Sequence, residues 1–229
     1  MYVAEPNVQL LAHTTIVPDS IEQNMQIQEG STDAETLTVY SGRSCFESWN
    51  RPNPKTRDDK DYLIRTLFEQ GHMSILEHAS ATLRITGVSR ALLAELTRHR
   101  HLSFSVRSQR FVSEEDAAIV LPPAIDGTTD ASTLENAAET ALREYEKLVV
   151  GLQDKGLPRK QAREAARAVL PNMVETRMVV TGNHRAWVET LHKRLAPGAD
   201  AEFQQVAKLM LDTLYPTAPA IYEHLKENH

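Results

Sequence analysis

The chain has 229 residues, of which 41% are hydrophobic and 24% charged, as in an ordinary soluble globular protein. Its 25 basic and 31 acidic residues give a net charge of −6, which excludes a uniformly basic coat for nucleic acid. The single cysteine, Cys45, excludes an internal disulfide and is a poor basis for a zinc site. The chain shows neither the pattern of an export signal nor an apolar run of membrane-spanning length. We therefore expect a cytoplasmic protein with no membrane partner.

Secondary structure in the first hundred residues is predicted from periodicity and from turn-forming residues. In chain order we predict a strand (9–17), two loops (18–33 and 48–59), a helix (61–70) that ends before Gly71, a strand (78–86) and a helix (89–98). The strand over 78–86 depends on alternating apolar and polar side chains, which is typical of a strand with one buried face.

The second half of the chain is richer in helical signals. In order we predict a loop (121–132), helices (132–152 and 159–170), a less regular strand (174–181) and helices (184–195 and 201–214). Ser132 with Glu135 matches a capping box, and Asn183 and Asp200 are suited to cap the last two helices. Trp187 is expected in the core. We predict one α+β domain over residues 1–229, helix-rich around a small mixed or antiparallel sheet.

Several common catalytic motifs are absent. None of the 9 glycines forms a GxG pair, so neither a dinucleotide fingerprint nor a P-loop is available. HExxH, GxSxG and CxxC do not occur either. Any phosphate group would therefore be bound by side-chain cations and scattered backbone amides.

The densest group of cations is Arg98-His99-Arg100-His101, which Arg107 and Arg110 follow. Alone, it is typical of a solvated last turn of a helix, where the dipole favours cations by about 0.3–1 kcal/mol. Ser108-Gln109-Arg110, however, places a hydroxyl, an amide and a guanidinium side by side, and such groups match phosphate oxygens. Closely spaced like charges also repel one another, so we predict an anionic ligand.

Three other features of the sequence could be either structural or functional. Arg159, Arg163 and Arg167 lie four residues apart on one helix face, and the first two are expected to form a solvated stripe. The 184–195 helix has basic residues at both ends, and its N-terminus offers free amides to an anion. Cys45 has only Arg43 as a basic neighbour, so a buried or half-buried structural thiol is favoured over a nucleophile.

Arg98-His99-Arg100, seven residues and then Ser108 resembles the RHR-x7-S motif of flavin-dependent thymidylate synthases. Four further blocks are similar to that family in order and spacing: Gly71-His72 with Glu77-His78, Gln109-Arg110-Phe111, Arg167 to Pro171, and Thr181 to Arg185 followed by Arg194. The resemblance implies an FAD-dependent methyltransferase of dTMP biosynthesis that methylates dUMP reductively to dTMP. It also implies 5,10-methylenetetrahydrofolate as carbon donor, NADPH as reductant, and a homotetramer with active sites between subunits.

The same resemblance implies the site residues by position. Cofactor contacts are expected from His78, Ser80, Arg98, His99, Arg100, Val106, Asn183, His184, Arg185 and Glu189. Contacts with dUMP are expected from Glu95, Leu96, Thr97, Arg98, Val106, Arg107, Ser108, Gln109, Arg110, Arg167 and Arg194. The family usually carries a histidine near position 198, where this chain has Gly198, so we expect that flavin contact to be missing or replaced.

Arg194 is the implied catalytic residue, which activates the pyrimidine. A guanidinium stays protonated at neutral pH and cannot act as a base, so its expected role is to stabilise negative charge that develops on the ring. Ser108 has no histidine–carboxylate relay beside it in the sequence, so substrate binding is favoured over nucleophilic attack.

Two hypotheses from other classes remain open at this stage. The first is a nucleic-acid or phosphate-binding module built on residues 90–110. The second is a metal-dependent hydrolase that uses histidines 72, 78, 99 and 101, with acidic support from positions 77 and 95. We expect neither a metal nor a nucleic-acid partner.

Overall fold

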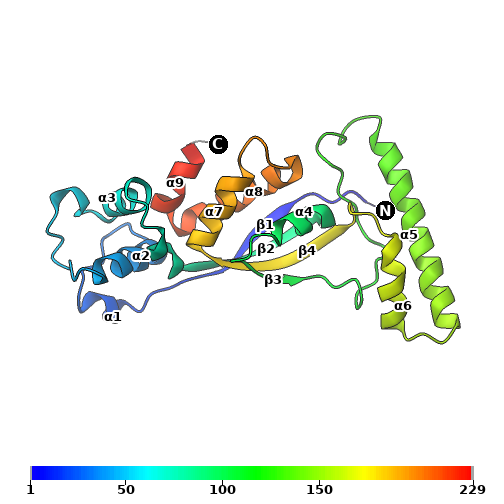
Figure 1. The fold of residues 1–229 in the computed structure, drawn as a ribbon, viewed down its shortest axis with the longest axis horizontal. Helices are drawn as coiled ribbons and strands as arrows, with labels where there is room; N and C mark the ends of the chain where they lie inside the picture. Colours follow the sequence, from blue (N-terminus) through cyan, green and yellow to red (C-terminus); the bar gives the residue numbers. More distant parts are fainter. Residues whose placement is uncertain (1, 228–229) are drawn as a thin grey trace.

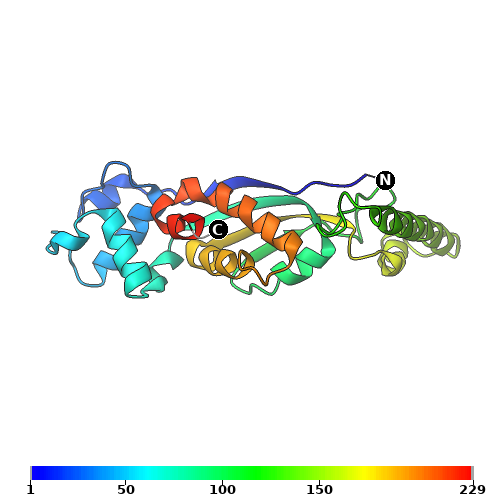
Figure 2. The ribbon, with the colours of Figure 1, turned by 90° about the horizontal axis from the view of Figure 1, so that it is seen from above.

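A computed structural model describes residues 2–227 and contains one four-stranded sheet in the order β1-β2-β4-β3. The strands are β1 (Asn7–His13), β2 (Ser80–Ser89), β3 (Ser103–Val106) and β4 (Glu175–Asn183). Every neighbouring pair is antiparallel. Helices α4 (Arg90–Leu96), α7 (His184–Arg194) and α8 (Ala201–Leu214) lie on one face of this sheet (Figures 1 and 2). The α+β prediction is confirmed, and the sheet is antiparallel rather than mixed.

The molecule is elongated because helices extend beyond both ends of the sheet (Figure 1). One end carries α1 (Pro18–Glu22), α2 (Asp33–Ser44), η1 (Pro54–Thr56), α3 (Asp59–Leu63), η2 (Ile64–Glu69) and η3 (Met73–Glu77). The other end carries α5 (Ala131–Asp154), α6 (Arg159–Ala166) and η4 (Arg167–Val169). The chain finishes with η5 (Tyr215–Thr217) and α9 (Pro219–Glu227), which packs beside α8.

The main core lies between the sheet and α7 and α8. Leu83 and Ile85 of β2 and Val180 of β4 are fully buried there. Trp187 is also fully buried, and its Nε1 donates to the backbone oxygen of Ala81 over 3.1 Å. Trp187 is therefore a core residue, as predicted, and α7 is fixed to the sheet by the face opposite its polar side chains.

The predicted caps of the two late helices are confirmed. Asn183 Oδ1 accepts from Ala186 N over 2.8 Å, and Asp200 Oδ1 accepts from Phe203 N over 3.1 Å. The capping box at Ser132 is wrong, because α5 starts one residue earlier and the Ser132 hydroxyl donates to the Thr129 carbonyl instead.

Other boundaries differ from the prediction in ways that local chemistry explains. The 61–70 helix is a short α-helix continued by the π-helical η2, and the 159–170 helix tightens into η4 ahead of Pro171, whose ring disfavours a helical residue before it. The predicted loop at 18–33 contains α1, and α2 was missed although Thr32 and Glu35 form a complete capping box. No helix among residues 2–227 is both long and apolar enough to cross a membrane.

Candidate active site

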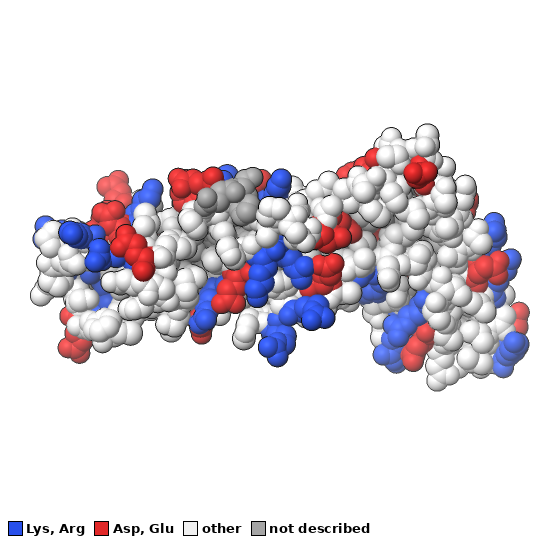
Figure 3. Space-filling view, turned by 45° about the horizontal axis from the view of Figure 1, so that its top comes forward, with Lys and Arg blue, Asp and Glu red and all other residues white. Residues whose placement is uncertain are grey.

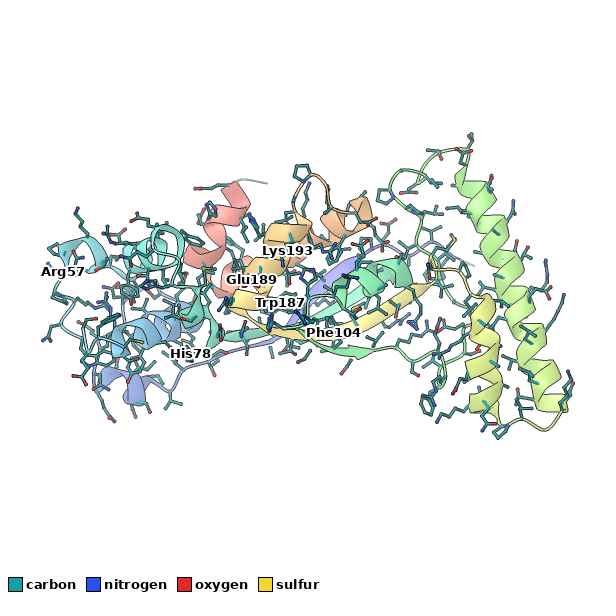
Figure 4. All side chains as sticks on the ribbon, in the orientation of Figure 1. Arg57, His78, Phe104, Trp187, Glu189 and Lys193 are labelled. Carbon is teal, nitrogen blue, oxygen red and sulfur yellow. The ribbon has the colours of Figure 1, made fainter. Side chains whose placement is uncertain are left out.

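A cavity of about 340 Å³ lies between residues 98–102, which follow α4, and one face of α7. The helix contributes Ala186, Glu189, Thr190, Lys193 and Arg194. These positions are three or four residues apart, so they share one side of the helix. Figure 4 shows Glu189 and Lys193 along α7, with Trp187 on the side toward the sheet.

The lining of this cavity is strongly cationic. Arg98, Arg100, Lys193 and Arg194 contribute four positive charges, against one carboxylate from Glu189. Within residues 2–227, neither Arg98 nor Arg100 takes part in an ion pair, and both are exposed. The space-filling view shows basic side chains gathered over the middle of the molecule as well as at its ends (Figure 3). Such a lining suits a ligand with several negative charges.

Arg194 is held at the back of this cavity by two residues from a distant part of the chain. Its Nη1 donates to Glu95 Oε2 over 2.5 Å, and its Nη2 donates to the Glu95 backbone oxygen over 3.2 Å. Its Nε donates to His99 Nε2 over 3.0 Å. The guanidinium also lies over the ring of Phe203, with Cζ 4.5 Å from the ring centroid. A guanidinium has five N–H groups, so two remain for a ligand.

His99 is a neutral member of this network. Burial, together with the neighbouring positive charges of Arg194 and Lys193, lowers the pKa of His99 to about 4. Its Nδ1 is 3.1 Å from the hydroxyl of Thr190. Since Arg194 Nε can only donate, Nε2 accepts and the ring proton belongs on Nδ1, where it is donated to Thr190.

A second cavity of about 230 Å³ adjoins the first and shares His101, Ala186 and Glu189 with it. Here Arg185 donates from Nη1 to Glu77 Oε1 over 2.5 Å and from Nε to Glu189 Oε1 over 3.0 Å. These bonds raise the pKa of Arg185. The two cavities together form a groove along α7 that is longer than either part.

The predicted dUMP residues from Val106 to Arg110 lie at the end of β3 that is far from α7. Ser103 pairs with Thr181 and the Arg107 N–H donates to the Arg177 carbonyl, so the segment runs away from α7 along β4. The four residue steps from Ser103 to Arg107 correspond to about 13 Å of extended chain. The two groups of predicted dUMP residues are therefore separated within one protomer.

Around that far end, cations and carboxylates form a partly buried network. Arg107 Nη1 is 3.2 Å from Glu114 Oε2 and 3.7 Å from Glu175 Oε2. Arg110 Nε is 2.8 Å from Glu164 Oε2 on α6. Burial lowers the pKa of Arg90, the negative charge of Glu114 raises it, and the positive charge of Arg167 lowers it. Arg167 itself is exposed and has no ion pair within residues 2–227.

The loop between β3 and this network presents further polar groups. Ser108 Oγ accepts weakly from the Arg110 N–H over 3.4 Å, and no histidine or carboxylate contacts it within the described chain. Gln109 is 8% exposed, and its Nε2 is buried without a partner in residues 2–227. Arg163, expected on a solvated face, is instead 6% exposed and donates to the Phe111 carbonyl over 2.7 Å. That expectation was wrong because α6 packs against the 107–113 loop.

Several predicted cofactor residues do not line the groove with their side chains. His184 is fully buried, with Nδ1 2.7 Å from the Tyr222 hydroxyl. Ser80 is paired with Thr14, and Val106 packs against the core. His78 is exposed at the end of η3. The predicted dUMP residues Leu96 and Thr97 are, respectively, buried in the core and bonded to the Ala94 carbonyl.

Three further residues belong to the site although sequence patterns did not predict them: Thr190, Lys193 and Phe203. The first two lie on the same face of α7 as Glu189 and Arg194, so helical spacing alone was a signal for them. Phe203 comes from α8, and its contact with Arg194 depends on how that helix packs.

Cys45 is exposed, so the expectation of a buried or half-buried thiol was wrong. It borders a cavity of about 510 Å³ beside α2 and η3, which Tyr62, His72 and Ser74 also line. Its thiol donates to the Ser41 carbonyl over 3.5 Å.

Neither alternative class of function gains support from the geometry. Over residues 2–227, no group of three or more histidine, cysteine, aspartate or glutamate side chains is arranged to hold a metal ion. The cations of residues 90–110 do not form one exposed stripe, because Arg90 and Arg107 are engaged around Glu114 while Arg98 and Arg100 line the α7 cavity.

Comparison with known proteins identifies the family. A family described as "Thymidylate synthase complementing protein" (Thy1) matches residues 26–220. The chain is 44% identical over 227 residues to the flavin-dependent thymidylate synthase of Mycobacteroides abscessus, covering 94% of this chain and 88% of that protein. It is 48% identical over 204 residues to the probable flavin-dependent thymidylate synthase of Mycobacterium phage L5, covering 86% of this chain and 83% of that protein.

The fold is also similar to a solved structure. The crystal structure of thymidylate synthase X from Helicobacter pylori with FAD and dUMP superposes with a TM-score of 0.66 at 22% identity. The match covers 96% of this chain and 98% of that one. Fold, sequence and cationic groove together define an enzyme of the flavin-dependent thymidylate synthase class. The chain belongs to the Thy1 family, as the RHR-x7-S resemblance predicted.

Proposed function

We propose that this enzyme methylates dUMP to dTMP, with 5,10-methylenetetrahydrofolate as the carbon donor, NADPH as the reductant and FAD as the bound cofactor. The observation that carries the proposal is the preorganised Arg194, whose guanidinium is fixed by Glu95 and a neutral His99 and faces a cation-lined cavity.

The residues of the α7 groove fit FAD. Arg98 and Arg100 are exposed cations without acidic partners in the described chain, and they suit the two phosphates of a dinucleotide. Asn183, Arg185 and Glu189 line the adjoining cavity and offer polar contacts beyond the phosphates. When bound and reduced by NADPH, FAD would supply the hydride that converts the methylene group from the folate into a methyl group. Contacts from His184 and Val106 would have to use the backbone, since their side chains pack inside the protein.

Arg194 acts on the pyrimidine electrostatically. Its charge is permanent at neutral pH, so it neither takes nor gives a proton. Its two unused N–H groups would donate to the pyrimidine edge of dUMP and stabilise negative charge that develops there. This stabilisation increases electron density at the carbon that attacks the methylene group.

The phosphate of dUMP would bind at the other group of predicted residues. Ser108 and the Arg110 side chain supply a hydroxyl and a guanidinium, and Arg167 supplies an exposed cation without an ion-pair partner in residues 2–227. Arg110 would exchange its half-exposed contact with Glu164 for the phosphate. We assign Ser108 to substrate binding and not to nucleophilic attack.

A complete site then requires more than one protomer. About 13 Å of strand separates Ser103, which follows the Arg98–His101 wall, from Arg107, and Arg167 follows α6 at that far end. A nucleotide bound by both groups of one chain would have to lie along this strand, whereas a second subunit could bring the 106–110 loop and Arg167 to the Arg194 cavity directly. We therefore propose that Glu95, Arg98 and Arg194 of one subunit face the 106–110 loop and Arg167 of another, in a homotetramer.

One assay tests the proposal directly. The purified enzyme is mixed anaerobically with NADPH in the presence and absence of dUMP, and flavin reduction is followed by absorbance. 5,10-Methylenetetrahydrofolate is then added and dTMP is quantified by chromatography. The proposal predicts a flavin spectrum and dTMP formation that depends on all three added compounds. A colourless protein that binds no added FAD, or a flavoprotein that forms no dTMP, would contradict it.

A further inference from the structure

The hydroxyl of Thr190 has no role in the reaction as described so far, yet it lies against the ring of His99. Thr190 is 1% exposed and belongs to the face of α7 that lines the cavity. Its Oγ1 is 3.1 Å from His99 Nδ1. Within residues 2–227 it is the one side chain that hydrogen-bonds this nitrogen.

The two contacts of the His99 ring select one tautomer. Arg194 Nε is always protonated, so the bond to His99 Nε2 exists only when that nitrogen carries a lone pair. The ring proton must then be on Nδ1, and a buried N–H needs an acceptor. Thr190 Oγ1 supplies that acceptor. In the other tautomer, Nε2–H would point at the guanidinium and the bond to Arg194 would be lost.

Phe203 and Glu95 also hold the Arg194 guanidinium, but their contacts do not depend on the tautomer of His99. Phe203 lies beneath Arg194 and presents its ring at 73° to that of His99, with centroids 6.2 Å apart. Glu95 binds Nη1 and Nη2 only. Nothing in these contacts distinguishes Nδ1–H from Nε2–H. The tautomer is therefore set by Arg194 Nε at one ring nitrogen and by the Thr190 hydroxyl, as the acceptor, at the other.

We propose that Thr190 is a positioning residue, whose hydroxyl holds His99 in the Nδ1–H tautomer so that Nε2 accepts from Arg194 and the free N–H groups of Arg194 point into the cavity. The consequence for turnover rests on the proposed function, whereas the tautomer is a property of the protein alone. Thr190 touches no substrate in this account and acts through His99.

The expected consequences of removing the hydroxyl follow from this chain of contacts. Without it, Nδ1–H has no partner, and the Nε2–H tautomer becomes competitive. Arg194 is then misoriented for part of the time. Losing one buried hydrogen-bond partner lowers kcat about tenfold, and the KM for dUMP should change less than about twofold because Arg194 acts mainly in the transition state.

The test compares Thr190→Val, which keeps the shape, and Thr190→Ala with Thr190→Ser, which keeps the hydroxyl. Nitrogen NMR of histidine-labelled enzyme reports the protonated ring nitrogen, and a His99→Gln variant identifies the signal. Thr38→Val is the matched control. Thr38, like Thr190, is a buried threonine in a helix, but its hydroxyl donates to the Ala34 carbonyl and not to a site residue.

We expect the wild type, Thr190→Ser and the control to show Nδ1–H, whereas Thr190→Val and Thr190→Ala show a shift toward Nε2–H together with the loss in kcat. The proposal is overturned if Thr190→Val and Thr190→Ala keep the Nδ1–H signature, or if Thr190→Ser is as impaired as they are. The NMR result is independent of turnover, so a failure of the proposed reaction would leave it readable.

Discussion

Arg194 donates from Nε to Nε2 of His99 over 3.0 Å, so the last residue of α7 is fixed by a ring from the segment after α4. Glu95 holds the other end of the same guanidinium through a side-chain and a backbone oxygen. An arginine side chain loses roughly 2 kcal/mol of rotamer entropy when it is ordered. Here that cost is met during folding, before any substrate binds. Preorganisation of this kind makes a charge effective in a transition state.

Replacing Arg194 with alanine should therefore abolish most turnover while leaving the cofactor bound. Removal of one preorganised donor typically lowers kcat by about 10² to 10³. Flavin absorbance after gel filtration should match the wild type, because Arg98 and Arg100 remain in the groove. Arg194→Lys should also be impaired, since a lysine ammonium cannot bond Glu95 and His99 while keeping two donors free. Near-normal kcat in Arg194→Ala would remove the basis of the mechanism.

Glu95→Gln tests whether the orientation of Arg194 matters as well as its charge. The amide keeps the shape of the side chain but removes the charge-assisted bond, and we expect kcat to fall about tenfold or more. Glu144→Gln is the matched control, because the Glu144–Lys147 pair is exposed on α5. Exposed ion pairs contribute little because solvent screens them, so steady-state kcat and stability should not change measurably in that variant. Equal kcat in the two variants would argue that Glu95 is only a surface partner.

Sequence patterns predicted those elements that are stabilised by neighbouring residues in the chain or by the burial of one face. The β2 strand alternates because one of its faces is buried, and Asn183 and Asp200 cap their helices within three residues. Ser132 and Glu135 have the residue types of a capping box but do not form one, because the Ser132 hydroxyl donates to the Thr129 carbonyl. The four-residue β3 has too few positions to show a period, and only its pairing with β4 defines it.

The site shows the same division between local and long-range information. The RHR segment and Arg194 were recognisable as motifs, and in the structure Arg98 and Arg194 border one cavity. The bonds of Arg194 to Glu95 and His99 join residues almost a hundred positions apart. No spacing rule predicts such a contact, since it depends on how α4 and α7 pack on the sheet.

Mixed oligomers test whether the site is shared between subunits. Arg167→Ala and Arg194→Ala chains are expected to be nearly inactive alone, because each lacks one half of every site. When they are co-expressed with different affinity tags and purified through both, one combination of protomers restores an intact site. Random assembly predicts recovery of up to about a quarter of wild-type turnover. A site contained in one chain predicts no recovery, which would leave the inter-subunit proposal without support.

Gly87 is a structural requirement of the bulge in β2, where the register with β4 shifts between Ile85 and Val88. Its φ is +68°, and an added Cβ would lie 1.8 Å from the Glu5 carbonyl oxygen. Gly87→Ala should lower the free energy of unfolding by roughly 3 kcal/mol or more, since strain and a backbone clash combine. Gly30→Ala is the control, with φ +88° and no atom near its Cβ, and should cost about 1 kcal/mol. Urea midpoints that do not separate the two variants would contradict the clash.

The buried pair of His184 and Tyr222 should make stability depend on pH. Burial lowers the pKa of His184 to about 4, and its Nε2 has no partner within residues 2–227. Its unfolded pKa is about 6.5. Between these values the unfolded state binds a proton that the folded state does not, so stability is full above pH 6.5 and falls as the pH falls toward 4.

For His184 alone, the free energy of unfolding should drop by about 2 kcal/mol between pH 7 and pH 5. Urea titrations of the wild type at both pH values measure the total drop, to which His99 and the carboxylates also contribute. The double variant His184→Phe/Tyr222→Phe removes the titrating group and its hydroxyl partner together, which avoids leaving either one unsatisfied. Between pH 7 and pH 5 its free energy of unfolding should decrease less than that of the wild type, and the difference should be the contribution of His184. Equal drops would show that this ring does not stay neutral in the folded core.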